Sequence, residues 1–491
     1  MSKERIENIK YFSTSLIFLI LSKAISLLLR MGSRIIIARF SSVEIYGLFS
    51  VIWSEMTFIS TLALLGLGQK LTIDLPREKK IEKRKSIISS LVYASIVGTF
   101  SLIVSIILNI INLENSYKYS TLIAAMFVIF LFVQFIFIGM KDFFGYFIQS
   151  ISQSLSMFIM IVILRNVLAI NLMIYVAFGS IVFSILLSGI YLLIKNKKEI
   201  HTISLKEIKI FDFSKERWNL FFVDIINCII LYLLLKLPQV IISNSLAGFV
   251  NVAFSLITFL IIPPQMIAVV LGPKLSEDFF NKKLTNLQNS FRISLSLLYI
   301  SQGFSIITFS YFGNFFIELL YGSKFLPSSS LIFYGFLLAV IIDSFNYPFA
   351  LYIRNTNNEG LFALGKAISF VTFVIPEVLL LSIFGDYSDL AVPIAYLISI
   401  LSLLAFYLFY TIKLNAKMEK KDIRKLLLWL AVVFTSTILA MITRYFLKKQ
   451  LFVLFVTAGN LFLFSIYLII SKTINIKGLI IESKELINSL K

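Results

Sequence analysis

The chain has 491 residues, of which 58% are apolar and only 14% are charged, and it carries a formal net charge of +19. A soluble domain keeps about a quarter of its residues charged, because it must cover its surface with water-facing groups. The composition therefore excludes a soluble globular protein and predicts a surface that faces mostly lipid.

Long apolar runs follow one another along the whole chain. A helix needs roughly 20 apolar residues to cross the hydrocarbon core, and runs without polar and apolar alternation exclude a transmembrane β-barrel. We therefore expect an all-α, polytopic membrane protein with about 14 spanning helices. The expected spans are Tyr11–Ala38, Gly47–Gly68, Ser86–Ile111, Ser120–Met140, Phe144–Leu164, Leu172–Ile194, Trp218–Leu237, Phe249–Gly272, Ile293–Leu319, Ser328–Tyr352, Lys366–Phe384, Leu390–Ile412, Leu426–Ile442 and Leu451–Ile470.

The basic residues are distributed unevenly between the two sides of these spans. With the N-terminus placed inside, the inside segments hold 34 Lys and Arg residues, the outside segments hold 8, and 3 lie within the first span. A missed span in the middle would invert every later loop and destroy this asymmetry. We therefore expect a multi-pass protein of the plasma or inner membrane, with both termini cytoplasmic and no nucleic-acid partner.

The longest internal connection separates six expected helices from the next six. Two similar segments, Leu67–Leu71 (LGQKL) and Leu271–Leu275 (LGPKL), enter the cytoplasm six helices apart. Two like halves with the substrate site at their interface are a common transporter plan. The expected parts are an N-terminal lobe at 1–200, a cytoplasmic loop at 201–217, a C-terminal lobe at 218–413, and two further helices with a cytoplasmic tail at 414–491.

The first helix carries three cations at helical spacing. Lys23, Arg30 and Arg34 fall within about 40° of one face at 3.6 residues per turn. An intramembrane cation costs at least roughly 2.5 kcal/mol on insertion scales, so this stripe must face polar groups. It predicts a wet cavity whose cations bind an anionic substrate group. The alternatives are snorkelling of Arg34 and a structural pair of Arg30 with Glu55, which lies at a similar depth in the second helix.

Intramembrane carboxylates form a second group of candidate residues. Besides Glu55 they are Asp224, Asp343 and Glu377, and the last follows a proline that bends its helix. Such carboxylates can exchange protons or bind Na⁺ when ionised, so we expect them to serve ion coupling. The alternative is a structural ion pair with a neighbouring helix.

Residues that signal an enzyme or a metal site are scarce. The chain has one cysteine, Cys228, and one histidine, His201, which together cannot form a zinc site. The expected outside loops are mostly under about a dozen residues, which leaves little room for a catalytic site. We therefore expect no catalytic residue, no bound metal and no cofactor, apart from H⁺ or Na⁺ as a coupling ion.

Four short segments, in order along the chain, resemble motifs of the polysaccharide-export flippases of the O-antigen and oligosaccharide type. This family belongs to the superfamily of multidrug, oligosaccharidyl-lipid and polysaccharide exporters. The segments are Ala38–Phe49 (ARFSSVEIYGLF), Leu65–Gly68 (LGLG), Ala247–Ala253 (AGFVNVA) and Leu320–Phe325 (LYGSKF). The resemblance implies two six-helix lobes in a V around a central cavity that opens to each side alternately, with helices thirteen and fourteen as an addition.

The same resemblance implies the substrate and the role of the first helix. The substrate would be an oligosaccharide joined through phosphate or diphosphate to a polyprenol, moved from the cytoplasmic to the outer leaflet for cell-surface polysaccharide assembly. Related flippases line a cationic cavity with first-helix arginines, the region that Lys23, Arg30 and Arg34 occupy here. The second lobe departs from this pattern, because Lys236 is the one candidate cation in its opening helix. The expected partners are the lipid-linked oligosaccharide, membrane lipids, and polymerases or glycosyltransferases of the same pathway, around a monomer.

Two other functions remain as alternatives. A cation-coupled multidrug efflux transporter has the same helix count, although three basic residues in the first helix disfavour a cationic substrate. A membrane-embedded glycan polymerase or glycosyltransferase would need a sizeable loop outside the membrane, and no expected outside loop has that length.

Overall fold

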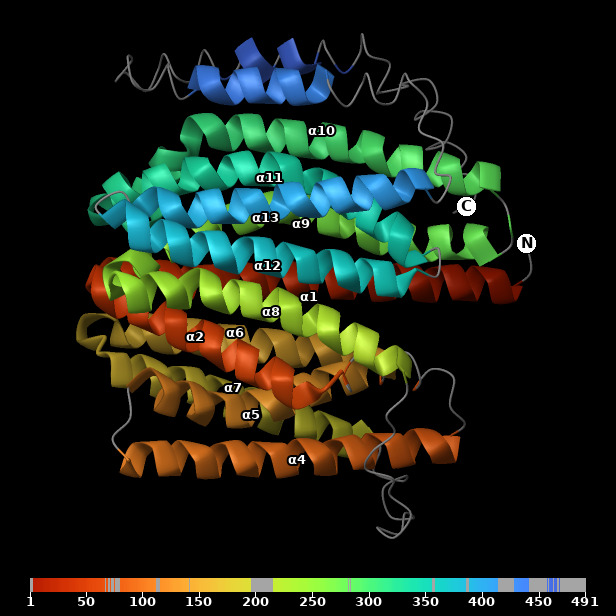
Figure 1. The fold of residues 1–491 in the computed structure, drawn as a ribbon. Helices are drawn as coiled ribbons and strands as arrows, with labels where there is room; N and C mark the ends of the chain where they lie inside the picture. The colour runs from red at the N-terminus through yellow and green to blue at the C-terminus, as the bar shows by residue number, and fades with distance from the viewer. Residues whose placement is uncertain are drawn as a thin grey trace. The chain divides into compact units, whose positions relative to one another are not determined.

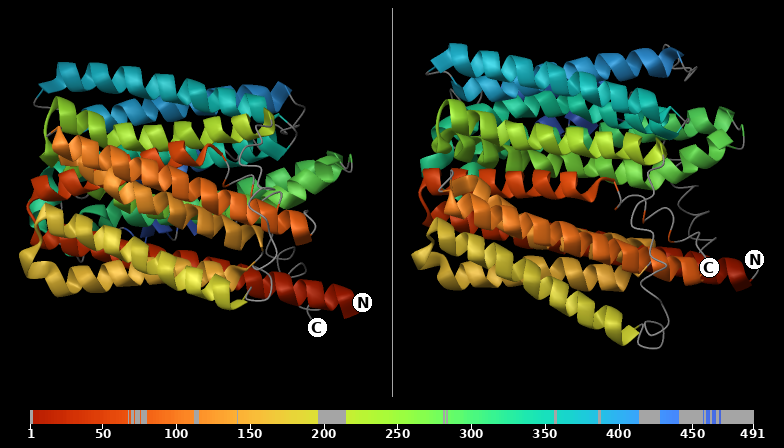
Figure 2. Two further views of the ribbon diagram at one scale, coloured as in Figure 1. Left: turned by 90° about the horizontal axis from the view of Figure 1, so that it is seen from below. Right: turned by 60° about the horizontal axis from the view of Figure 1, so that its bottom comes forward.

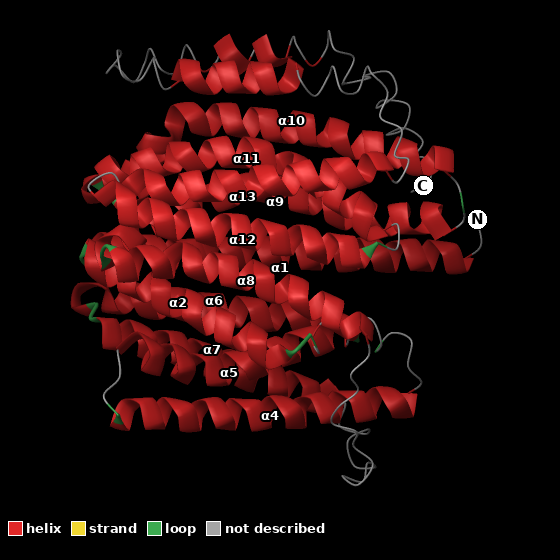
Figure 3. Ribbon diagram, viewed as in Figure 1, coloured by secondary structure: helices red, strands yellow, loops and turns green. Residues whose placement is uncertain are grey.

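The computed structural model (Figure 1) describes residues 3–66 with 68, 71 and 75, then 80–111, 115–140, 142–195, 215–280 with 282, 284–355, 358–385, 388–413, 428–440 and single positions from 457 to 468. Every regular element in these ranges is a helix (Figures 2 and 3). Eleven of the described helices are long and apolar enough to cross a membrane. The expected all-α, multi-pass membrane protein is thus confirmed, while the total of fourteen spans stays a prediction.

The chain packs into two compact units, Met1–Asn251 and Val252–Lys491. The expected inter-lobe loop at 201–217 lies mostly outside the described residues, and the division into lobes there stays a prediction. The first unit contains α1 (Lys3–Phe40), α2 (Val43–Leu64), α4 (Lys80–Ile110), α5 (Asn115–Gly139), α6 (Phe143–Leu164), α7 (Ile170–Lys195), α8 (Lys215–Ile241) and the first turns of α9 (Asn244–Phe280).

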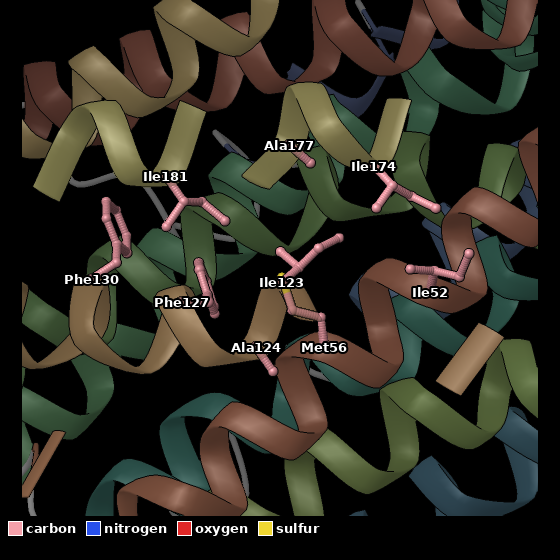
Figure 4. Packing of buried hydrophobic residues seen from close by; sticks show 9 residues of the cluster. All are labelled: Ile52, Met56, Ile123, Ala124, Phe127, Phe130, Ile174, Ala177 and Ile181. Carbon is pink, nitrogen blue, oxygen red and sulfur yellow. The ribbon is translucent and has the colours of Figure 1, made fainter. Parts of the chain in front are cut away.

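Within the first unit, α5 packs against α2, α4, α6 and α7, and α6 also packs against α1. The core between α2, α5 and α7 is apolar and closely packed (Figure 4). It buries Ile52 and Met56 of α2 against Phe127 of α5 and Ile174 of α7. Because α2 turns this face inward, Glu55 and Phe58 lie on another face of the same helix, toward α8.

Helix α4 presents a mostly apolar face to its surroundings. Phe100 is 66% exposed and Ile110 is 76% exposed, and several isoleucines between them are also exposed. An apolar face of this size is a liability in water and is stable against lipid tails. The exposure therefore agrees with a membrane-spanning helix.

The turn into α6 carries a charged anchor. Asp142 caps this helix by accepting a hydrogen bond from the Gly145 amide, and the Lys195 ammonium at the end of α7 donates to Asp142 at 2.6 Å. Burial alone would lower the pKa of Lys195, but its hydrogen bonds with Asp142 and Tyr191 raise it above its ordinary value. A paired charge at the end of two spans is typical of the membrane boundary.

The second unit contains the rest of α9 and four further long helices, with α11 in contact with α10, α12 and α13. Two hydrogen bonds between hydroxyl groups join α12 to α13: Ser369 with Ser399 at 2.7 Å, and Thr372 with Ser402 at 2.6 Å. The bounds are α10 Leu284–Phe316, a π-helix Ile317–Tyr321, a 3₁₀ turn Ser323–Phe325, α11 Leu326–Asn355, α12 Glu359–Phe384, α13 Ser388–Lys413 and a shorter helix Leu428–Ala440.

Candidate functional site

Arg30 of the first helix lies on the side of α1 that packs against α6. Arg30 interacts electrostatically with Arg34, one turn on, and with the Tyr146 hydroxyl of α6. Its Nε atom is buried and has no hydrogen-bond partner in the described part of the chain. A buried donor without a partner is costly, so this guanidinium is suited to an incoming acceptor. Lys23 is part of α1, but its side chain lies outside the described part of the structure. Anion binding by Lys23, Arg30 and Arg34 stays a prediction.

Helix α6 adds a buried polar stripe that the sequence reasoning missed. Gln149 and Gln153 are both fully buried, and their Oε1 atoms have no hydrogen-bond partner in the described residues. The Gln149 amide donates to the Phe130 carbonyl at 2.7 Å, and Ser150 accepts from Gln134 at 3.1 Å. The spacing of three and four residues within QSISQS places these groups on one helix face, and this spacing was the available signal.

In the described part of the chain, Glu55 forms an ion pair with Lys236 of α8. Lys236 Nζ lies 3.0 Å from Glu55 Oε1, and both side chains are almost fully buried. The same ammonium lies 4.6 Å from the centre of the Tyr117 ring of α5. Glu55 is thus paired with Lys236, and the structure brings together residues from three helices that the sequence had left apart. The pairing of Glu55 with Arg30 stays a prediction.

Asp343 lies in a polar cluster of the second unit. The Asn346 amide donates to its Oδ1 at 2.9 Å, one turn further along α11. Lys366 of α12 and Tyr396 of α13 interact with it electrostatically. Asp343 is thus held by neighbouring groups, which suits a structural role as well as an ion-coupling one, so its coupling role stays a prediction.

The other two carboxylates differ from each other. Glu377 is fully buried on α12, and in the described part of the chain neither of its carboxylate oxygens has a hydrogen-bond partner. Asp224 is half-buried on α8, one turn from Cys228, with which it interacts electrostatically. Among the described residues, no group of three His, Cys, Asp or Glu side chains could hold a metal ion.

A family model described as polysaccharide biosynthesis protein matches residues 13–279, more than half of the chain. A comparison with curated proteins finds no match.

Solved structures of transporters and flippases share the fold. The lipid II flippase MurJ in an inward closed conformation has a TM-score of 0.60 and 16% identity, over 91% of this chain and 98% of that chain. An inward-facing multidrug resistance MATE transporter of the MOP superfamily has 0.61 and 12%, over 81% and 98%. A MOP transporter from Pyrococcus furiosus, whose binding pocket is described as having reverse polarity, has 0.54 and 14%, over 82% and 94%. This chain has the MOP-superfamily fold.

Proposed function

Because the chain belongs to the polysaccharide biosynthesis protein family, we propose that it is an alternating-access flippase for a polyprenyl-(di)phosphate-linked oligosaccharide. It moves this substrate from the cytoplasmic to the outer leaflet of the cell membrane, where surface polysaccharide is assembled. The observation that carries the proposal is the pair of guanidinium groups, Arg30 and Arg34, within the first helix of a MOP-type fold.

The arginines of α1 match the physical requirements of moving this substrate across the membrane. A sugar chain with a phosphate or diphosphate cannot cross hydrocarbon unaided, because its charges and hydroxyl groups lose their hydration, whereas the polyprenol tail is stable in lipid. Arginine binds phosphate oxygens with two parallel hydrogen bonds, and the buried Nε of Arg30 is available to such an acceptor. We assign Arg30 and Arg34, with Lys23, to the phosphate group of the substrate.

The energetics favour outward movement of an anion. When the outside is positive, a net negative substrate gains about 2.3 kcal/mol per charge for each 100 mV. The proposal places both termini in the cytoplasm, with H⁺ or Na⁺ as coupling ion at intramembrane carboxylates, Glu377 first among them. It also places glycosyltransferases or polymerases of the same pathway beside a monomeric flippase.

Multidrug efflux is the alternative that the MATE likeness raises. A pocket for cationic drugs needs anionic or aromatic walls, whereas α1 itself carries Arg30 and Arg34 one turn apart. For this reason we place efflux second, and a membrane-embedded glycan polymerase behind both.

Replacement of Arg30 tests the proposal. Arg30→Ala should abolish surface glycan and leave its lipid-linked precursor on the cytoplasmic side, while the protein stays inserted and resistance to cationic drugs is unchanged. Arg39→Ala, which removes an exposed cation from the end of the same helix, is the matched control and should export glycan normally. Normal surface glycan in Arg30→Ala cells would refute the anion site, and lost drug resistance with normal glycan would favour efflux.

A further inference from the structure

Helices α2 and α8 meet in a continuous antiparallel seam. Its pairs lie at regular intervals, with residue numbers that sum to between 289 and 291, as expected of two helices that run in opposite directions. The seam consists of Glu55 against Lys236, Phe58 stacked on Tyr232 with ring centres 5.2 Å apart, and Thr61 against Cys228 at 3.2 Å. Gly47 against Asn244, the first residue of α9, continues the same register beyond the end of α8. The α2–α8 seam is therefore apolar or small at most points and carries a pair of full charges at one point.

That charged point lies in the middle of α2 and five residues before the end of α8. Glu55 is eight residues beyond Gly47 along α2, so it is roughly 12 Å from the contact of Gly47 with Asn244. Its side chain is 1% exposed and that of Lys236 is 7% exposed. Buried ion pairs gain little stability over apolar residues of similar volume, because both ions lose their hydration. Stability alone therefore explains this buried pair poorly.

The surroundings of the Lys236 ammonium would allow it to exchange the Glu55 carboxylate for another anion. Apart from Glu55, the described group that faces the ammonium is the ring of Tyr117, 4.6 Å away. The Tyr232 side chain lies beside the pair and interacts with Tyr117 and with Glu55. The Tyr117 ring holds the ammonium through its π face, which contributes no competing negative charge. One carboxylate oxygen at 3.0 Å is a monodentate contact that a diphosphate, with more charge and more acceptor oxygens, can replace.

We propose that Lys236 is a phosphate-binding residue of the substrate site, and that Glu55 is its built-in counter-ion in the substrate-free protein. The substrate's phosphate or diphosphate displaces the Glu55 carboxylate from Lys236. Lys236 thereby adds a cation on α8 to the phosphate-binding arginines proposed on α1. The displacement also removes one tie of the α2–α8 seam, so substrate binding and loosening of α8 from α2 are linked. The inference rests on the flippase function proposed above.

Binding to the purified full-length protein in detergent tests this exchange. The probe is farnesyl diphosphate, with farnesol as the uncharged control. Glu55→Gln removes the competitor and should tighten farnesyl diphosphate binding on the order of tenfold, within the usual range of coupling between sites. Lys236→Met should weaken it at least on the order of tenfold, and farnesol binding should not change in either variant.

The double variant Glu55→Gln/Lys236→Met keeps the shape of the seam without either charge, and it guards against misfolding of the single variants. A double variant that melts like wild type but has lost farnesyl diphosphate affinity supports the proposal. Equal diphosphate affinity in wild type and the double variant would overturn it and leave the pair a structural tie.

The two proposals fail in different experiments. Loss of glycan in Arg30→Ala cells together with unchanged diphosphate affinity in the Lys236 variants would overturn this inference alone. Normal glycan in Arg30→Ala cells would overturn the proposed anion site on α1.

Discussion

The α2–α8 seam offers a cross-linking experiment that uses the only cysteine of the chain. Cys228 Sγ lies 3.2 Å from Thr61 Oγ1, so Thr61→Cys places a second thiol beside it. A disulfide joins its sulfur atoms at about 2.05 Å, and the two groups therefore need to approach by only about 1.2 Å. We expect nearly complete cross-linking on mild oxidation, visible as a mobility shift on a non-reducing gel.

The cross-link should change both stability and transport. It would close a loop across 167 residues, which the chain-entropy relation values at about 5 kcal/mol. This is an upper limit, because inserted helices limit the freedom of the unfolded chain. If α8 must part from α2 during transport, oxidised cells should lose surface glycan, and a reductant should restore it.

Two observations would refute this reasoning. Failure of the thiols to react would contradict the register of the seam. Complete cross-linking with normal glycan export would show that α2 and α8 stay together throughout the cycle. Thr61→Cys/Cys228→Ser, which keeps the substitution without a partner thiol, should export glycan normally with or without oxidant.

Two further predictions concern other positions. Gly47→Ala should lower the melting temperature in detergent, because its Cβ would lie 1.8 Å from the Asn244 carbonyl oxygen and overpacking costs about 1–3 kcal/mol. The control Gly179→Ala, whose Cβ would have nothing within 4 Å, should be neutral or gain up to about 1 kcal/mol. Equal melting temperatures of the two variants would contradict the close approach of Gly47 to Asn244. Glu377→Gln should keep the melting temperature while glycan export falls at least about tenfold. It replaces a buried carboxylate, which has no hydrogen-bond partner among the described residues, by a group of the same shape. Full export would remove Glu377 as the coupling residue.

The sequence by itself determined the class of protein and the course of its spans. The expected span Phe144–Leu164 is α6 to within one residue, because a helix in lipid must satisfy its backbone hydrogen bonds within its own segment. Hydropathy is thus a local property that the chain displays directly. Where the expectation fell short, as at α10, which begins at Leu284 rather than Ile293, the helix continues through polar residues that hydropathy does not mark.

The tertiary structure alone decided which buried charges meet. Depth along a hairpin allowed Glu55 to face Arg30, yet its described ion pair is with Lys236, 181 residues away along the chain. Asn251 likewise donates to Tyr46 and Ser50 across more than 200 residues. Nothing in an apolar helix specifies its neighbours, because lipid and protein interiors are similarly apolar and association depends on close packing. Contacts such as that of Gly47 with Asn244 therefore fix the arrangement, and the sequence shows them only once the helices are packed.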